Sequence, residues 1–468
     1  MWVGVERRGM HRIDPATGDA LEPVAEHDAE DVDAALDEAT AAFESWSDTR
    51  LEERRRLLTE AADVLRDRTE EFARLMTREM GKPIEGARAE VEKSAWGLDH
   101  YAEHAPEYLA DEHIGTEAGT KSFVSYEPLG PVLAVMPWNY PFWQVFRFAA
   151  PNLVAGNVGL LKHASNVPEC ALAIESVFEE AGFPEGVFRT LVVGSERAEE
   201  VIRDDRVRAV TLTGSEPAGR AVGGAAGEEL KPSVLELGGS DPFVVLDDAD
   251  LAAAASVGAS ARTLNSGQSC IAAKRFVVHT DVYDEFLERF VAEMESLVVG
   301  DPTDEGTDVG PQAREDLMAE VHEQVTASVE AGATVETGGE PLDRDGFFYP
   351  PTVLTDVPRD APLGCEEVFG PAAAVFEVES EAAAVELAND SDLGLGASVW
   401  TEDLERGERV ARRIESGGVF VNELTKSDPR LPFGGIKDSG YGRELARQGI
   451  RAFLNEKTVW VQDTDDQP

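Results

Sequence analysis

Residues 265–270 read NSGQSC and place a cysteine among small polar residues, whereas a structural thiol usually lies among Leu, Ile and Val. Asn265, Ser266 and Gly267 favour a turn with accessible backbone amides. As a thiolate, Cys270 could attack an electrophilic carbon, and amides of the turn could stabilise both the thiolate and the oxyanion formed next. The stretch alone fits a structural thiol equally well, so the residues around it decide the interpretation.

Two other residues have side chains that could assist a thiol nucleophile. Glu236 lies in VLELGGSDP, at the end of an apolar strand-like run and just before two glycines. A carboxylate at the mouth of a strand suits a general base whose pKa is tuned by partial burial, although a lone Glu is more often a solvated acid. Asn139, between the two prolines of PWNYP, could present an amide donor or be an ordinary turn residue.

Length and charge limit the classes of protein. A chain of 468 residues with 42% hydrophobic residues predicts two or three domains. There are 91 acids and 42 bases, which gives a formal charge of −49 and makes nucleic acid a poor partner. The acids are spread over the chain (AEHDAEDVDAALDEA, GDPTDEGTD, VQDTDDQP), as in halophilic proteins. A salt-rich cytoplasm is therefore expected, with an acidic enzyme of ordinary salinity as the alternative.

The ends of the chain and its cysteines favour a cytoplasmic enzyme. The start, MWVGVERRGMHRID, does not read as a signal sequence, and no run of eighteen apolar residues occurs, so neither secretion nor a membrane is expected. The cysteines, Cys170, Cys270 and Cys365, form no CxxC pair and no His/Cys cluster. Neither disulfides nor a metal site is predicted.

The pattern along the chain predicts an α/β fold. Residues 28–113 combine apolar residues at helical spacing with many Glu, Arg and Ala, which indicates tandem helices. From 121 onward, strand-like runs alternate with helical ones, as in RAVTLTGS followed by EPAGRAVGGAAG. This alternation is typical of a doubly wound parallel sheet, first over about 130–237 and again from 238 to 430. SFVSYEP and KTVWVQD lack an evident partner strand and could cross to another subunit, so a homo-oligomer is expected.

Together the motifs resemble the aldehyde dehydrogenase superfamily over nearly the whole chain. The resemblance is carried, in the family's order, by DPATG, PWNYP, LKHAS, TLTGSEPAG, LELGGSDP, NSGQSC, GDPTDEGTDVGP, EEVFGP and LPFGGIKDSGYGREL. It implies an aldehyde dehydrogenase-like fold with two doubly wound parallel-sheet domains and a small β oligomerisation element. The dinucleotide-binding domain would comprise 1–115 and 130–237, the catalytic domain 238–440, and the oligomerisation element 116–129 and 441–468.

The resemblance also implies a role for each catalytic residue. Cys270 would attack an aldehyde to give a thiohemiacetal, whose oxyanion is held by the Asn139 side chain and the Cys270 backbone amide. After hydride transfer to a nicotinamide, Glu236 would activate the water that hydrolyses the resulting thioester to a carboxylic acid.

A dinucleotide site is implied although the GxGxxG fingerprint is absent. Gly214 and Ser215 of GSEPAG precede a helix whose N-terminus could hold a phosphate. By resemblance the cofactor would also be contacted by Trp138, Lys162, Leu237, Glu367 and Phe369.

Two positions depart from the family's pattern. Ser165 stands where many members have an acid that binds the adenosine 2′-hydroxyl and repels a 2′-phosphate, so NADP becomes possible beside NAD. Ser240 replaces a common lysine, and no consequence follows from the sequence.

The substrate prediction depends on two arginines. Arg147, eight residues after Asn139, matches a position where succinic semialdehyde dehydrogenases bind the substrate carboxylate, and Arg430 is a second candidate. Leu264 stands where some of these enzymes have a further arginine. The leading hypothesis is NAD(P)-dependent oxidation of succinate semialdehyde to succinate. The alternatives are another small aldehyde such as lactaldehyde, an ion-paired structural Arg147, and a non-catalytic scaffold of the same fold.

Overall fold

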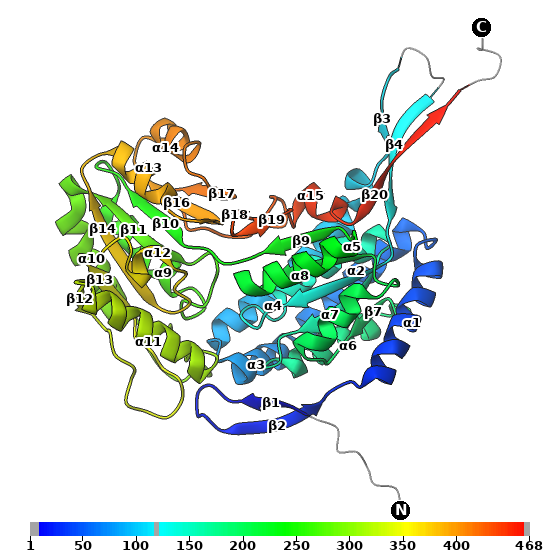
Figure 1. Ribbon diagram of the computed structural model, residues 1–468, viewed down its shortest axis with the longest axis horizontal. Helices are drawn as coiled ribbons and strands as arrows, with labels where there is room; N and C mark the ends of the chain where they lie inside the picture. The colour runs from blue at the N-terminus through cyan, green and yellow to red at the C-terminus, as the bar shows by residue number, and fades with distance from the viewer. Residues whose placement is uncertain (1–8, 117–120, 463–468) are drawn as a thin grey trace, which may run out of the picture.

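The computed structural model describes residues 9–116 and 121–462 (Figure 1). Residues 1–8, 117–120 and 463–468 lie outside the described residues. They include the start on which the absence of a signal sequence was judged, most of VQDTDDQP, and the outer ends of the predicted domain division.

The N-terminal part is a hairpin followed by the tandem helices expected from residues 28–113. The hairpin is β1 (Gly9–Ile13) with β2 (Ala20–Ala25), and the helices are α1 (Ala29–Trp46), α2 (Leu51–Asp67), α3 (Thr69–Met80) and α4 (Ile84–Tyr108). Helix α1 starts at a capping box between Asp28 and Asp31, and α3 stops at the left-handed Gly81. The buried faces of these helices join the core around the first sheet.

The first large sheet has six strands in the order β19-β9-β8-β5-β6-β7. Its strands are β5 (Pro131–Met136), β6 (Val158–His163), β7 (Phe188–Thr190), β8 (Ala209–Thr213), β9 (Ser233–Glu236) and the antiparallel edge strand β19 (Gly440–Tyr441). The connecting helices are α5 (Trp143–Ala155), α6 (Pro168–Glu180), α7 (Ser195–Arg203) and α8 (Glu216–Glu228). Because β5 to β9 are mutually parallel, their carboxyl ends meet at one edge, where such sheets bind ligands.

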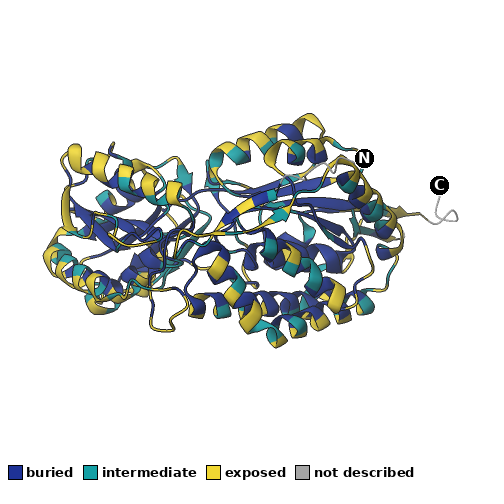
Figure 2. Ribbon diagram, turned by 90° about the horizontal axis from the view of Figure 1, so that it is seen from below, coloured by how far each residue is buried: buried dark blue, intermediate teal, exposed yellow. Residues whose placement is uncertain are grey.

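The second sheet has seven strands in the order β12-β13-β14-β11-β10-β16-β17. They are β10 (Asp241–Val245), β11 (Ala273–His279), β12 (Thr334–Thr337), β13 (Thr352–Thr355), β14 (Ala372–Val378), β16 (Gly396–Trp400) and β17 (Gly418–Val421). The helical segments of this part are α9 (Leu251–Thr263), η1 (Thr280–Val282), α10 (Tyr283–Ser296), α11 (Glu315–Glu330), α12 (Pro362–Cys365), α13 (Glu381–Asn389) and α14 (Leu404–Ala411). Phe243 and Val245 face one core cluster and Val244 the other, so helices cover both faces, and Figure 2 shows buried strands inside exposed helical surfaces. The predicted fold class, two doubly wound parallel-sheet domains, is confirmed.

The C-terminal part returns from the second sheet to the first. β15 (Leu393–Gly394) pairs with β18 (Ile436–Lys437), and α15 (Ala446–Arg451) then packs against α4 and α5. The two segments without an evident partner pair with each other: β4 (Lys121–Pro128) is antiparallel to β20 (Leu454–Val461), and β3 (Glu112–His113) adds a short third strand. These strands extend beside the C-terminus, away from the second sheet (Figure 1). Their sequence separation hid the pairing from local pattern analysis.

Candidate active site

The loop that carries Cys270 follows the end of α9 and is strongly bent. Asn265, Ser266 and Gly267 all have left-handed φ angles, of 55°, 58° and 78°. A Cβ on Gly267 would lie 2.3 Å from the carbonyl carbon of Gly370, so this position admits only glycine. The bend turns the chain back toward β11 and leaves Cys270 partly exposed.

Two buried cations hold this loop, and sequence analysis missed both. Arg262 donates from Nη2 to the carbonyls of Gly267 at 2.8 Å and Val368 at 3.3 Å. Lys274 donates from Nζ to the Cys270 carbonyl at 2.7 Å and to that of the preceding serine at 3.1 Å. The only sequence signal was a charged residue inside an otherwise buried helix or strand.

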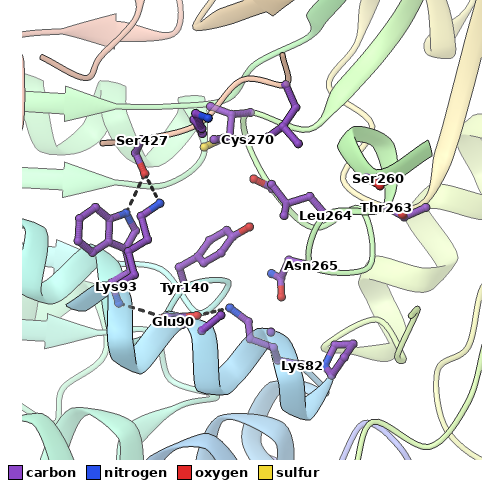
Figure 3. Close-up of a pocket in the computed structure, with 18 of the residues that line it drawn as sticks. Lys82, Glu90, Lys93, Tyr140, Ser260, Thr263, Leu264, Asn265, Cys270 and Ser427 are labelled. Carbon is purple, nitrogen blue, oxygen red and sulfur yellow. Dashed lines mark hydrogen bonds and ion pairs between the residues drawn. The ribbon is translucent and has the colours of Figure 1, made fainter. Parts of the chain in front are cut away.

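Cys270 lies where two cavities meet. One cavity, of about 490 Å³, is lined by α4, α5, the end of α9 and the segment 424–427, and Figure 3 shows its side chains, including Cys270 and Tyr140. The other, of about 390 Å³, opens at the carboxyl edge of the first sheet. Cys270 and Gln144 line both. A nucleophile in this position can contact one ligand from each side.

Asn139 is buried beside the cysteine loop. Its Nδ2 donates to the carbonyl of Gln268 at 3.1 Å, which uses one of two amide hydrogens, and Asn265 donates to the Asn139 carbonyl at 2.8 Å. Among the described residues the backbone N–H of Cys270 has no acceptor. Two donors beside Sγ therefore remain available to an oxygen. Burial raises the pKa of the Cys270 thiol to about 12, and the nearby Lys274 opposes this rise.

Glu236 ends β9 and is 2% exposed. It does not line either cavity, although the next two residues line the second. Burial, and then the negative charge of Glu444, raise the pKa of Glu236 well above its usual value, while Arg147 opposes this shift. A Cβ on Gly434 would lie 2.5 Å from Oε1 of Glu236, so glycine there leaves room for the carboxylate.

The second cavity gathers six of the eight predicted cofactor residues. Its lining contains Trp138, Gly214, Ser215, Leu237, Glu367 and Phe369. Ser215 precedes α8 without capping it, so the first-turn amides remain open to a ligand phosphate. The rings of Trp138 and Phe369 meet edge to face with centroids 5.6 Å apart, and Glu367 accepts from the Gly239 amide at 3.0 Å. An elongated anionic ligand with an aromatic ring fits this lining.

Lys162 and Ser165 lie outside that lining but at the same sheet edge. Lys162 is in β6, whose carboxyl end is next to that of β5, and Ser165 is exposed in the loop after β6. Burial lowers the pKa of Lys162. Both residues thus lie at or just beyond the carboxyl end of β6, and their contact with the cofactor stays a prediction.

The two predicted substrate arginines are already paired. Arg147 lines the first cavity, but it forms an ion pair with Glu444 and stacks on the Phe433 ring at 4.7 Å. Arg430 does not line the cavity: it is exposed and paired with Asp428 at 2.6 Å, which holds its guanidinium outside. The structure thus places Arg430 outside the lining of this cavity, where a carboxylate two residues away holds its charge, and its role toward the substrate stays a prediction.

Residues from α4 that sequence analysis did not single out line the first cavity. Glu90 accepts from the backbone amides of Phe142 and Trp143 at 2.8 and 3.0 Å and so caps the start of α5, and it also pairs with Lys82. Lys93, one turn further along, donates to Ser427 at 2.9 Å. Buried polar residues on an apolar helix face were the signal that could have identified them.

The described residues contain neither a metal-binding cluster nor a membrane-spanning helix. No group of three or more His, Cys, Asp or Glu is arranged to hold a metal ion in 9–116 and 121–462. None of the helices in the same ranges is long and apolar enough to cross a membrane.

The fold and the site define a known class: residues 2–459 match the model described as the aldehyde dehydrogenase family, and the chain belongs to this family. Among curated relatives, it is 54% identical over 449 residues to "Probable succinate-semialdehyde dehydrogenase [NADP(+)]" of Synechocystis sp., covering 96% of this chain and 99% of that one. It is 52% identical to "Succinate-semialdehyde dehydrogenase [NADP(+)] 1" of Mycobacterium tuberculosis, with 96% and 99% covered.

A solved structure is also similar to this chain over nearly the whole length of both. Succinic semialdehyde dehydrogenase from Streptococcus pyogenes, in complex with NADP+, superposes with a TM-score of 0.95 at 37% identity and covers 97% of this chain and all of that one.

Proposed function

We propose that this protein oxidises succinate semialdehyde to succinate with NADP or NAD. The observation that carries the proposal is the position of Cys270, partly exposed at the junction of a small-molecule cavity and a cavity suited to a dinucleotide. The names of relatives at 52–54% identity support the substrate and the cofactor. The combination of Cys270, Asn139 and Glu236 argues against a non-catalytic scaffold.

The chain's own groups account for the carbon chemistry. Sγ of Cys270 adds to the aldehyde carbon as the thiol proton passes to solvent water, and the developing oxyanion receives hydrogen bonds from the free Asn139 amide hydrogen and the Cys270 backbone N–H. A bound NADP or NAD supplies the hydride acceptor. Glu236 takes a proton from the water that attacks the thioester. Cleavage of the C–S bond then frees the Cys270 thiolate and releases the acid. Because burial raises its pKa, Glu236 accepts this proton more strongly than an exposed glutamate would.

The proposal also covers the roles of the two large sheets, the oligomeric state and the cellular environment. The six-stranded part would bind the dinucleotide, the seven-stranded part would present Cys270, and the β3-β4-β20 sheet would join copies of the chain in a homo-oligomer. Trp460 and Val461 of β20 are exposed apolar residues, which supports this use. Three free cysteines favour a reducing cytoplasm, and the charge of −49 favours a salt-rich one.

The substrate is tested by comparing succinate semialdehyde with butanal, an uncharged aldehyde of the same carbon count, in molar potassium chloride. We expect kcat/KM to favour the semialdehyde by tenfold or more, about 1.4 kcal/mol of transition-state discrimination. Initial rates of NADPH formation measure it. Equal rates, or a preference for butanal or lactaldehyde, would leave a general aldehyde dehydrogenase instead.

The cofactor is tested by Ser165→Glu. A carboxylate at this exposed position repels the 2′-phosphate of NADP but can accept from the 2′-hydroxyl of NAD. We expect kcat/KM for NADP to fall about 100-fold while that for NAD changes little, and Ser165→Gln, which adds the same bulk without charge, should lose much less. Unchanged NADP kinetics in Ser165→Glu would show that the phosphate lies elsewhere.

A further inference from the structure

Lys93 differs from the other cations that line the first cavity. Lys82 is paired with Glu90, Arg147 with Glu444, and exposed Lys426 with Glu423 at 2.7 Å. Lys93 is half-buried and, within the described ranges, forms no ion pair with any carboxylate. Its Nζ instead donates to the Ser427 hydroxyl and lies 4.7 Å from the centre of the Trp143 ring.

The carboxylates near Lys93 are already used. The two that act on its charge are Glu90, which pairs with Lys82 and caps α5, and Asp428, which pairs with Arg430. A cation held away from water without a matching anion is unfavourable, and an anion entering the cavity removes that cost. Lys93 is therefore a cation of this cavity without a carboxylate of its own among the described residues.

Ser427 indicates where an anion paired with Lys93 would bind. Its Oγ accepts from Lys93 at 2.9 Å and from Nε1 of Trp143 at 3.0 Å (Figure 3). Both lone pairs are then occupied, so the hydroxyl hydrogen must point elsewhere, and it has no acceptor among the side chains and backbone of the described chain. The other two N–H donors of Lys93 have no acceptor among the described residues. Together they offer a charge-assisted pair of donors to a carboxylate.

We propose that Lys93, with Ser427 held against it, binds the carboxylate of the substrate and so selects succinate semialdehyde over uncharged aldehydes. This inference rests on the proposed function and assigns to Lys93 the recognition that the sequence assigned to Arg147 and Arg430. Figure 3 shows Lys93 and Ser427 on one side of the cavity and Leu264 on the opposite side, so the anionic end of the substrate would lie toward α4.

The charge state of Lys93 agrees with this assignment. Burial and the nearby charge of Arg147 lower its pKa to about 8, Lys82 acts in the same direction, and Glu90 and Asp428 oppose them. The amine is mostly protonated below pH 8, and a bound carboxylate would favour protonation further. The preference for the semialdehyde should therefore decline as the pH rises through and above 8.

The test measures kcat/KM for succinate semialdehyde and for butanal in Lys93→Met, which keeps an unbranched apolar side chain against Trp143. We expect the semialdehyde value to fall on the order of 100-fold, mainly through KM, and the butanal value to stay within about threefold. Succinate should also lose its ability to inhibit butanal oxidation competitively. In the wild type the ratio of the two values should fall between pH 7 and 9.5, and in Lys93→Met it should be flat.

Matched variants separate charge from fold. Lys426→Met removes a cation from the same cavity wall that Glu423 already neutralises, and it should keep the wild-type ratio. Lys93→Arg should restore part of the preference. If Lys93→Met does not fold, Ser427→Ala, which removes no charge, should still reduce the preference about tenfold.

The outcomes distinguish the inference from the proposed function. A wild type that prefers the semialdehyde, with a Lys93→Met variant that keeps the preference, overturns the inference and leaves the function intact. Equal losses for both aldehydes in Lys93→Met also overturn it, because they indicate a structural role. A wild type without any preference overturns the proposed substrate itself.

Discussion

Cys270→Ala should abolish dehydrogenase activity, with turnover lower by about 10⁴-fold or more. The variant retains both cavities, Asn139 and the loop held by Arg262 and Lys274, since these contacts reach the backbone and not the thiol. It lacks only the atom that bonds to the aldehyde carbon. Steady-state NADPH formation from succinate semialdehyde measures the loss, and retained binding of NADP, followed by fluorescence, shows that the cofactor cavity is intact.

The control for this variant is Cys365→Ser. Cys365 is an exposed thiol on α12 that donates a hydrogen bond from Sγ to the Ala361 carbonyl at 3.3 Å. Replacing this thiol should change turnover less than twofold. The result that would refute the assignment is activity in Cys270→Ala close to that of the wild type, or an equal loss in Cys365→Ser. Either would place the nucleophile elsewhere.

A proton must leave Cys270 before or during its attack on an aldehyde. With a pKa raised to about 12 by burial, the thiol is protonated at neutral pH, and it must lose its proton during attack. Among the charges that act on Cys270, Lys274, which donates to the Cys270 carbonyl, lowers the pKa of the thiol most. The loop thus combines a thiol of raised pKa with a buried lysine that favours its thiolate.

The sequence predicted the parallel sheets well because their signals are local. Most strands of the first sheet are short apolar runs with a helix close by in the sequence. PWNYP follows β5, and TLTGSEPAG and LELGGSDP contain the ends of β8 and β9, so Asn139, Gly214 and Leu237 meet at one edge. The pairing of β4 with β20 joins residues more than 300 positions apart, and no local pattern could predict it.

The substrate end of the site was harder to predict, because the ion-pair partner of a buried charge can lie far away in the sequence. The partner of Arg147 is set by the fold, because Glu444 comes from the C-terminal part. The partner of Arg430, Asp428, lies two residues away and was already visible in the sequence. Lys93 lay in a helix that read as ordinary packing. Its significance comes from the lack of a carboxylate partner in the part of the chain that the structure describes, and only the assembled cavity reveals this.

Glu236→Gln should block turnover while leaving the first half of the reaction intact. The amide is nearly isosteric with the carboxylate but cannot accept a proton from water, so thioester hydrolysis should slow by about 10²–10⁴-fold. We expect a rapid burst of one NADPH per active site, followed by very slow hydrolysis of the thioester and release of succinate. Mass spectrometry of the denatured variant should then find succinyl bound to Cys270.

The pH dependence and a control make the assignment of Glu236 specific. Burial and Glu444 raise the pKa of Glu236, so in the wild type the fraction able to act as base, and with it the hydrolysis rate, should grow as the pH rises from the acid side. Glu236→Gln should lose this dependence. Glu228→Gln, at an exposed glutamate paired with Arg203 before the same strand, should behave as the wild type. A Glu236→Gln variant without a burst would instead place the carboxylate before hydride transfer, as the group that deprotonates Cys270.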